Sequence, residues 1–324
     1  MTPVMCWHFW RREEKGPFAV FFCASRCAFF LHASIFFFIF LSTVLITLPI
    51  RTAPQGESFC DYPRSTGRGN HLRKPLTTST MPVIYEPQGR AQEYSELAIN
   101  LYTGCSHRCQ YCYVPQALRT NLEAWSTHPQ PRKKILQTLS AEARKMSGCT
   151  KEVLLSFSSD PYQSDEAAAV TREALLILEA NYFQSVQVLT KAGHRAKRDF
   201  DIFERNPCFW KFGSSISFLS ESLRERWEPG APSIASRIAA VQEAYQRGVY
   251  TWVSVEPVVD HEEALQVIAA LRPFTNLFKI GKLNHMQPDT PIDWAAFLRD
   301  VRAVLGDHPH IIKKDLLVYE HSEN

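Results

Sequence analysis

The sequence predicts an α/β fold built from repeated strand–helix units, and three observations support this prediction. Short apolar, β-branched segments alternate with helix-like segments in the second half of the chain, a pattern typical of parallel strands joined by right-handed crossovers. Polar or charged residues follow directly after the predicted strands, where parallel strands bring their C-terminal ends to one rim. The chain of 324 residues is 45% hydrophobic, which suffices for one large domain or two ordinary ones.

The hydrophobic spacing gives the expected elements in order. The clearest helix is Ser233–Arg247, because Pro232 and Ser233 begin it, apolar residues recur at helical spacing, and Gly248 ends it. The other expected helices are Val170–Ala180, His261–Leu271 and Asp293–Leu305. The expected strands are Leu97–Leu101, Val153–Ser158, Ser185–Thr190, Trp210–Phe218, Val249–Val255 and Leu277–Ile280, with a last short strand near Ile311.

The charge is unevenly distributed along the chain. The net charge of +3 comes from residues 1–80, which hold nine Lys and Arg against four Asp and Glu. The remainder holds 27 basic and 29 acidic residues, a net charge of −2. Bulk charge therefore gives no support for nucleic-acid binding by the core, and only a local basic patch would provide it. The nine cysteines lack paired spacing, which favours a reducing compartment.

Residues 1–80 differ from the rest of the chain and are predicted to be a non-core extension. Residues 28–50 are apolar with His32 as the one titratable group, which is long enough for a membrane helix. Residues 51–80 read as a polar linker. Either the segment is a genuine membrane anchor or the gene model starts too early and Met81 is the native start, and the second is favoured. Residues 81–324 are the predicted core domain.

Three cysteines, Cys105, Cys109 and Cys112, lie within eight residues and are the predicted metal ligands. Three thiolates can hold three irons of a four-iron cluster and leave the fourth open to bind a small molecule. Tyr111, directly before the last cysteine, is expected to shield the cluster from water. A structural zinc site is the alternative, and its fourth ligand would be Cys149, Cys208 or a distant histidine.

This C-x3-C-x2-C triplet with its aromatic residue resembles the signature of radical S-adenosylmethionine (radical SAM) enzymes. The resemblance covers residues 81–316. It implies a partial (β/α)6 TIM-like barrel, a 4Fe-4S cluster, S-adenosylmethionine and a flavodoxin- or ferredoxin-like electron donor in the cytoplasm. The branch is identified as the one related to spore photoproduct lyase, often labelled DNA-repair photolyase-like, by four further segments: Ser156-Phe-Ser-Ser-Asp-Pro-Tyr-Gln163, Leu189-Thr-Lys191, Ser254-Val-Glu-Pro257 and Ile280-Gly-Lys-Leu-Asn284.

The resemblance also implies roles for the cofactor-binding residues at the strand ends. Ser158 and Asp160 would accept hydrogen bonds from the amino group of S-adenosylmethionine, although Asp160-Pro161 could simply form a turn. Lys191 would pair with the carboxylate of the cofactor, helped by Ser215 or Ser217 at the end of the fourth strand. The alternative for Lys191 is a solvated surface lysine in a basic segment.

Three further residues are assigned to the ribose or the substrate. Glu256 is expected to bind the ribose or the substrate, or else to form a structural salt bridge. Lys282 and Asn284 are assigned to the substrate side as the catalytic candidates.

Three function classes remain open on the sequence. The leading one is a radical SAM enzyme that cleaves S-adenosylmethionine to a 5′-deoxyadenosyl radical and acts on an unassigned substrate, with a nucleic-acid base suggested by the branch. The second is a zinc-stabilised binding module without catalysis. The third is a membrane-anchored iron–sulfur electron carrier. Spore photoproduct lyase uses a cysteine as hydrogen donor, and neither Cys149 nor Cys208 can be assigned that role from the sequence.

Overall fold

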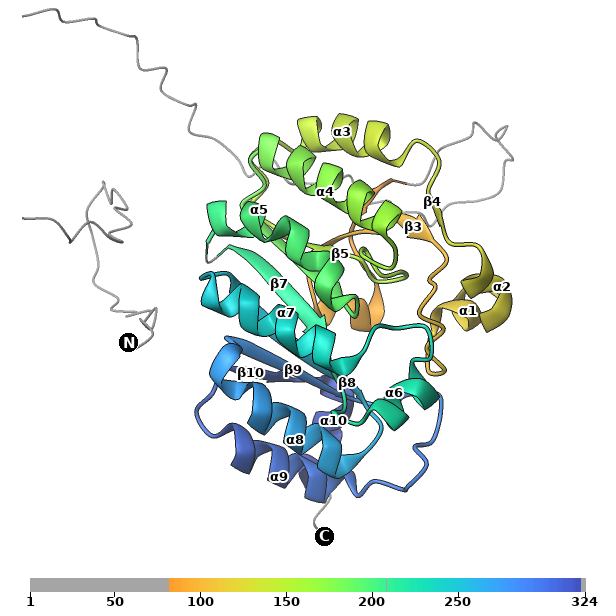
Figure 1. Cartoon of the computed structure of the whole chain (residues 1–324), viewed down its shortest axis with the longest axis vertical. Coiled ribbons are helices and arrows are strands. Elements are labelled where there is room, and N and C mark those ends of the chain that lie inside the picture. Colours follow the sequence, from red (N-terminus) through yellow and green to blue (C-terminus); the bar gives the residue numbers. More distant parts are fainter. Residues whose placement is uncertain (1–81, 208, 322–324) are drawn as a thin grey trace, which may run out of the picture. The chain divides into compact units, whose positions relative to one another are not determined.

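The structure is a computed structural model that describes residues 82–207 and 209–321 (Figure 1). The expected apolar segment 28–50, the linker 51–80 and Cys208 lie outside these residues, so the division at residue 81 stays a prediction. In the described ranges, no helix is long and apolar enough to cross a membrane.

An eight-stranded sheet forms the centre of the described part, in the order β1-β2-β5-β6-β7-β8-β9-β10. All neighbours pair in parallel except β1, which is antiparallel to β2. The strands are β1 (Ile84–Tyr85), β2 (Leu97–Ile99), β5 (Glu152–Leu155), β6 (Ser185–Thr190), β7 (Trp210–Ser215), β8 (Tyr250–Val258), β9 (Leu277–Lys282) and β10 (His310–Ile312). The predicted partial barrel of parallel strands is confirmed, and the chain adds β1 at one edge and β10 at the other.

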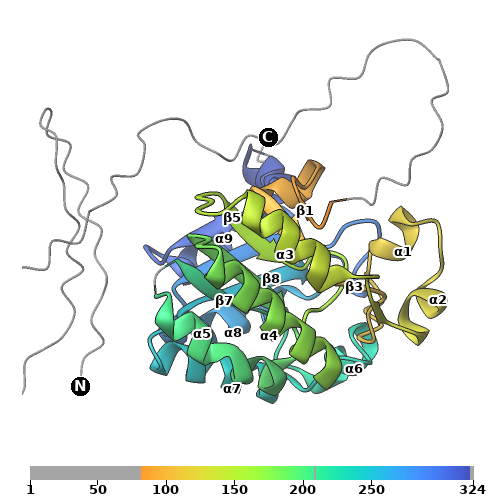
Figure 2. The same cartoon turned by 90° about the horizontal axis from the view of Figure 1, so that it is seen from above.

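Helices cover the outer face of this sheet (Figure 1). They are α3 (Ile135–Lys145), α4 (Asp165–Ala180), α5 (Phe200–Arg205), α7 (Ile234–Gln246), α8 (His261–Leu271) and α9 (Trp294–Leu305). Shorter helices are α1 (Val114–Ala117), α2 (Leu122–Thr127), α6 (Glu221–Trp227) and α10 (Lys314–Leu317). Short 3-10 helices cover Gly89–Glu93, Gly193–Asp199, Arg272–Phe274 and Val318–His321. Figures 1 and 2 show α1, α2 and α6 together at the same end of the strands.

The helices begin where a side chain caps the first turn. Ser164, Ser233, Asp260 and Asp293 each accept a hydrogen bond from a backbone N–H of the following helix, which satisfies a donor that the helix itself leaves free. The Ser233 cap confirms the expected start of α7. Helix α4 begins five residues before the expected Val170, because Ser164 caps it and small residues continue its buried face. Helix α3 was not among the predicted helices.

The strands divide their side chains between two faces. On β8, Val253 and Val255 join the hydrophobic core, whereas Trp252, Ser254 and Glu256 alternate with them and face the inside of the barrel. A Cβ atom on Gly213 would lie 2.2 Å from the Trp252 ring, so only glycine fits at that position of β7. The inside of the barrel is partly polar, and this is where the predicted site residues emerge.

Candidate active site

The three cysteines lie on a loop that leaves a two-stranded ribbon at the C-terminal end of the sheet. The ribbon pairs β3 (Tyr102–Thr103) with β4 (Gln130–Pro131), and Cys105 follows it directly. Gly104 has φ +91°, and a Cβ atom there would lie 2.8 Å from the Trp125 carbonyl oxygen. The Cys105 N–H donates to that same oxygen at 3.3 Å. Glycine is thus required for the chain to turn into the cysteine loop.

Two neighbouring segments fix the shape of this loop. The Gln163 side chain accepts from the Ser106 N–H at 2.7 Å and donates to the Gly104 carbonyl at 3.2 Å. On the other side, the Gly230 N–H donates to the His107 carbonyl at 2.9 Å. A Cβ atom on Gly230 would lie 2.1 Å from the Ser106 carbonyl oxygen, so the two segments are in close contact. The loop is therefore held in one conformation by the protein alone.

The three thiols are free and half-buried. Burial raises the pKa of the Cys105 thiol to about 12 and also raises the pKa values of Cys109 and Cys112. A bound metal reverses this, because a coordinating thiol is deprotonated outright. Between residues 82 and 321, apart from residue 208, no three His, Cys, Asp or Glu side chains are gathered as ligands of one metal ion. Three thiols on one loop are nevertheless the donor type that the irons of a cluster take, one thiolate each.

A buried group of charges lies behind the cysteine loop. Lys191, at the end of β6, donates to the Ser215 hydroxyl at 2.8 Å and lies 3.7 Å from a Glu228 oxygen. Glu228 also pairs with Arg237 at 2.5 Å, and both of these side chains are fully buried. Burial alone would raise the pKa of Glu228, but Arg237 and Lys191 outweigh it and hold that pKa below its ordinary value. The lysine, the glutamate and the arginine therefore form one charged network.

Tyr111 packs into this network rather than standing apart from it. Its hydroxyl donates to Glu228, its ring lies 6.3 Å from the Trp227 ring, and the Lys191 ammonium lies 5.7 Å from its centroid. The expected shielding of a cluster by Tyr111 stays a prediction. Its contacts show that Glu228 holds Tyr111, which lies between Cys109 and Cys112 in the sequence, in place.

The Asp160 carboxylate accepts several hydrogen bonds from other groups of the protein. Its carboxylate accepts from the Tyr162 N–H at 2.8 Å, the Thr190 hydroxyl at 2.7 Å and the Lys191 N–H at 2.7 Å. It also lies 3.5 Å from the His107 ring. The turn that the sequence analysis offered as an alternative is thus present. In addition, Asp160 ties the cysteine loop to the end of β6.

For two of the three candidate serines, no hydrogen bond of the side-chain hydroxyl is described. The Ser158 N–H donates to the Asn100 side chain at 3.0 Å, and no contact of its hydroxyl with the cofactor-site residues is described. Ser217 is buried, and its hydroxyl has no hydrogen-bond partner in the described part of the chain. Ser215 is therefore the serine of the fourth strand that contacts Lys191.

Glu256, Lys282 and Asn284 lie farther along the same rim. Glu256 accepts from the Tyr94 hydroxyl. Lys282 donates to the Tyr319 hydroxyl at 2.9 Å, and Asn284 donates to Asp315 at 2.7 Å. The last two side chains thus contact the C-terminal segment, which lies beside the first described elements (Figure 2). No described contact joins them to the Lys191 network.

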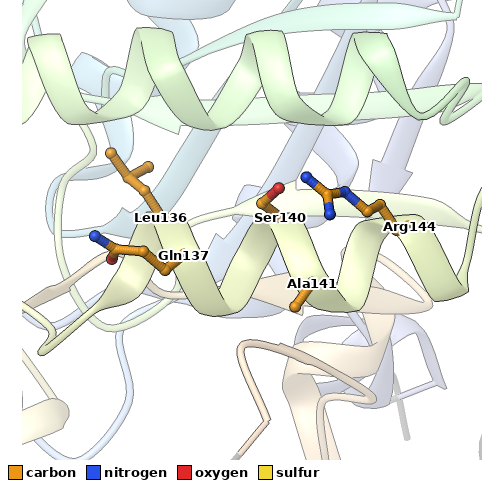
Figure 3. A pocket seen from close by; sticks show the side chains of 5 residues that line it. All are labelled: Leu136, Gln137, Ser140, Ala141 and Arg144. Atoms are coloured by element: carbon orange, nitrogen blue, oxygen red, sulfur yellow. The ribbon is translucent and has the colours of Figure 1, made fainter.

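The other residues that were considered from the sequence are either paired with acidic side chains or lie away from this rim. The basic segment near Lys191 is neutralised, since Arg195, Lys197 and Arg198 each lie within 3.7 Å of an acidic side chain. Cys149 is buried before β5, at the strand end opposite the cysteine loop. A hollow of about 410 Å³ is lined by one face of α3 (Figure 3) and does not include any predicted site residue.

Sequence reasoning missed Glu228, Arg237 and Gln163 as parts of the site. Glu228 stands in a short Trp-Glu-Pro-Gly segment after α6, and Arg237 lies within a regular helix. Neither position carries a motif or a spacing that indicates a role. Only the packing of α6 and α7 against the cysteine loop brings them together.

The chain is similar to several known proteins. Two curated relatives are uncharacterized proteins. One, from Methanocaldococcus jannaschii, is 25% identical over 59% of this chain and 71% of its own length. Another, from Mycobacterium tuberculosis, is 25% identical over 50% of this chain and 49% of its own length, so the chain matches about half of the mycobacterial protein.

Solved structures of radical SAM enzymes share the fold. A variant of spore photoproduct lyase aligns with a TM-score of 0.55 at 17% identity, over 69% of this chain and 78% of its own. Streptococcus suis SuiB bound to S-adenosylmethionine aligns with a TM-score of 0.51 at 12% identity, over 70% of this chain and 52% of its own. At such identities the likeness concerns the fold.

The family model of the radical SAM superfamily matches residues 99–272, more than half of the chain. This range contains the cysteine loop, Lys191 with its serine partner, and the buried Glu228–Arg237 pair that supports them. The resemblance read from the sequence is confirmed: the chain belongs to the radical SAM superfamily.

Proposed function

We propose that the protein binds a 4Fe-4S cluster on Cys105, Cys109 and Cys112, binds S-adenosylmethionine beside it, and acts on a nucleic-acid substrate. When bound, the reduced cluster supplies the electron that cleaves the sulfonium of S-adenosylmethionine and yields a 5′-deoxyadenosyl radical. The observation that carries this proposal is the clamped loop with three half-buried thiols next to the partly buried Lys191. Family membership favours this function over a zinc-stabilised module or a simple electron carrier.

Some residues of the chain bind the cluster or the cofactor, and others hold these residues in position. The three cysteines hold three irons, and Gln163 and Gly230 keep their loop in shape. Lys191, held by Ser215, pairs with the carboxylate of S-adenosylmethionine. The Ser158 hydroxyl accepts from its amino group, whereas Asp160 positions the loop and β6. Ser217 lies close to the same strand end and is a further candidate for the cofactor. An external reductant, such as a flavodoxin- or ferredoxin-like protein, supplies the electron.

Anaerobic reconstitution with iron and sulfide tests the proposed activity. We expect about four irons per chain and formation of 5′-deoxyadenosine after dithionite and S-adenosylmethionine are added. A protein that retains zinc, or an iron protein that leaves the cofactor intact under these conditions, would contradict the proposal.

Replacing Lys191 by methionine is expected to leave the iron content unchanged and to weaken binding of S-adenosylmethionine about 10- to 100-fold. Hydrogen bonds to charged groups contribute about 1.5–3 kcal/mol, and the methionine keeps the apolar stem while removing the ammonium. Calorimetric titration of the cofactor into the oxidised protein measures this effect. Lys197→Met, which removes a lysine paired with Glu243 at the surface, is the control and should bind like the wild type. Equal binding by the Lys191 variant would remove that residue from the cofactor site.

The nucleic-acid substrate is supported by a basic segment around the cysteine loop. Residues 105–134 hold five Arg and Lys against one acidic residue, and Arg108, Arg119, Lys133 and Lys134 are exposed. Tyr113 and Leu118, on the same segment, are 50% and 57% exposed. Basic side chains with exposed apolar groups are suited to a phosphate backbone and unstacked bases. A structure of spore photoproduct lyase, which shares this fold, is complexed with dinucleoside spore photoproduct.

Reversing two charges of this segment, Lys133→Glu with Lys134→Glu, is expected to weaken binding of a single-stranded oligonucleotide at least about 10-fold at low salt. The slope of log affinity against log salt should fall by about 1.4, since each phosphate contact on a single strand contributes about 0.7. Fluorescence anisotropy measures both quantities. The matched control is Arg144→Glu with Lys145→Glu on the exposed face of α3, which should bind normally. If both double variants lose affinity equally, the segment has no specific role in nucleic-acid binding.

A further inference from the structure

Tyr111 and Lys191 meet at a single oxygen of Glu228. The Tyr111 hydroxyl donates to Glu228 Oε1, and the Lys191 ammonium lies 3.7 Å from the same atom. A hydrogen bond from nitrogen to oxygen spans about 2.7–3.2 Å, so the lysine is attracted to this oxygen without being hydrogen-bonded to it. The tyrosine and the lysine are thus alternative donors to one buried oxygen.

The glutamate is fixed from its other side. Its second oxygen, Oε2, pairs with Arg237 at 2.5 Å. Arg237 is itself fixed, because it donates to the Ser215 carbonyl at 3.2 Å and to the Pro232 carbonyl at 3.0 Å. Glu228 is fully buried, and a buried oxygen that loses its donor is costly. A movement of roughly 0.8 Å would bring Lys191 from 3.7 Å to a hydrogen-bond distance of about 2.9 Å and replace a lost donor at Oε1.

The observed arrangement leaves donors of Lys191 available to a ligand. An ammonium has three N–H donors, and the described hydrogen bond of Lys191 uses one of them, to the Ser215 hydroxyl at 2.8 Å. The Lys191 side chain is 15% exposed, so it can be reached from outside the buried network. A lysine that donated to Glu228 would use a second donor, and its charge would be more strongly compensated. It would then attract an anionic ligand less strongly.

The backbone contacts around Tyr111 place its hydroxyl at the glutamate. The Gln110 N–H donates to the Trp227 carbonyl at 2.8 Å, and the rings of Tyr111 and Trp227 lie 6.3 Å apart. The residues that precede Tyr111 and Glu228 in the sequence are therefore paired with each other. The hydrogen bond between the two side chains continues this contact between the cysteine loop and the end of α6.

We propose that Tyr111 is a positioning residue for the binding of S-adenosylmethionine: its hydroxyl occupies Glu228 Oε1 and so leaves Lys191 free to pair with the carboxylate of the cofactor. This role belongs to the hydroxyl, whereas the expected shielding of the cluster belongs to the aromatic ring. The inference rests on the proposed function, in which Lys191 binds that carboxylate. It requires tyrosine, and not merely an aromatic residue, at position 111.

Replacing Tyr111 by phenylalanine keeps the ring and removes the hydroxyl. We expect this variant to retain the iron content of the wild type and to bind S-adenosylmethionine about 10-fold more weakly, because the Lys191–Glu228 bond must then break before the cofactor carboxylate can pair with the lysine. Calorimetric titration into the oxidised, cluster-containing protein measures the affinity. Tyr245→Phe is the control, since this tyrosine packs on Phe274 near the end of α7 and the variant should bind like the wild type. Equal affinity in Tyr111→Phe and the wild type would overturn the proposal.

Two double variants distinguish this role from general damage to the cysteine loop. Adding Glu228→Gln to Tyr111→Phe removes the charge that competes for Lys191, so the affinity should return to that of the wild type. In a Lys191→Met background, Tyr111→Phe should cause no further loss, because the lysine through which the tyrosine acts is absent. A further loss of affinity in either double variant would contradict the assignment.

Glu228→Gln alone decides the question if Tyr111→Phe does not hold the cluster. Its amide oxygen can still accept from Tyr111, and the competing charge is gone, so this variant should bind the cofactor at least as tightly as the wild type. Weaker binding would mean that Glu228 positions Lys191 by attraction, and the proposal would be wrong. Iron content and 5′-deoxyadenosine formation by the wild type, measured on the same preparations, report separately on the proposed function.

Discussion

Replacing Cys109 by alanine is expected to reduce the iron content after reconstitution from about four per chain to near zero and to abolish formation of 5′-deoxyadenosine. Cys109 is the middle ligand of the loop, and its thiol is near enough to Lys191 and Glu228 for both to act on it. Among the described residues, no other cysteine lies on this loop or its clamps to replace it. Iron analysis and chromatography of the adenosine product measure the two effects.

The control for this variant is Gln110→Ala in the same loop. Gln110 is exposed, and its side chain contacts only the Arg108 carbonyl, at 3.2 Å. Its backbone N–H, which donates to the Trp227 carbonyl at 2.8 Å, is kept in the variant. The alanine should therefore bind iron like the wild type. Retention of four irons by Cys109→Ala, or equal loss in both variants, would contradict the assignment of Cys109 as a ligand.

Replacing Arg237 by methionine is expected to lower the free energy of unfolding by about 3–5 kcal/mol, because it leaves Glu228 buried without its nearest cation. Arg237 also donates to the Ser215 carbonyl at 3.2 Å and to the Pro232 carbonyl at 3.0 Å, so two further acceptors lose a donor. Lys191, at 3.7 Å, stays near Glu228 but is fixed on another strand. Urea denaturation followed by tryptophan fluorescence measures the change.

Two comparisons separate the buried pair from a general effect of losing an arginine. Arg247→Met, at the end of the same helix, breaks a surface pair with Glu204 at 2.6 Å and should cost no more than about 1 kcal/mol. Adding Glu228→Gln to Arg237→Met should recover part of the lost stability, because the uncompensated charge is then gone. If the double variant is less stable than Arg237→Met by the full effect of Glu228→Gln alone, the two residues are not coupled.

The fold could be predicted from local patterns because the strand side chains that face the helices are apolar and buried. Val253 and Val255 on β8, like Val186 and Val188 on β6, are fully buried against the helices, and runs of this kind mark parallel strands. The cap at Ser233 likewise depends on a few neighbouring residues. Helix α3 was missed, because it follows a left-handed Lys134 without a capping side chain and has no start signal.

The residues of the candidate site were chosen from the sequence by residue types with a characteristic chemistry, and their roles stay predictions. Three closely spaced cysteines and a lysine that directly follows a β-branched strand are such signals. The Lys191–Ser215 contact agrees with the expected serine partner. Lys282 and Asn284 contact Tyr319 and Asp315 of the C-terminal segment, and their assignment to the substrate side stays a prediction.

The sequence by itself determined the cysteine triplet, most of the strands and long helices and, through the resemblance, the superfamily, because these depend on patterns within short segments. Only the tertiary structure decided that Glu228 and Arg237 pair behind the cysteine loop and that Glu228 accepts from Tyr111. The residues in these contacts come from elements far apart in the chain. They indicate a role because their charged or polar groups are buried away from solvent. Burial depends on the packing of the whole domain, so no local pattern records it.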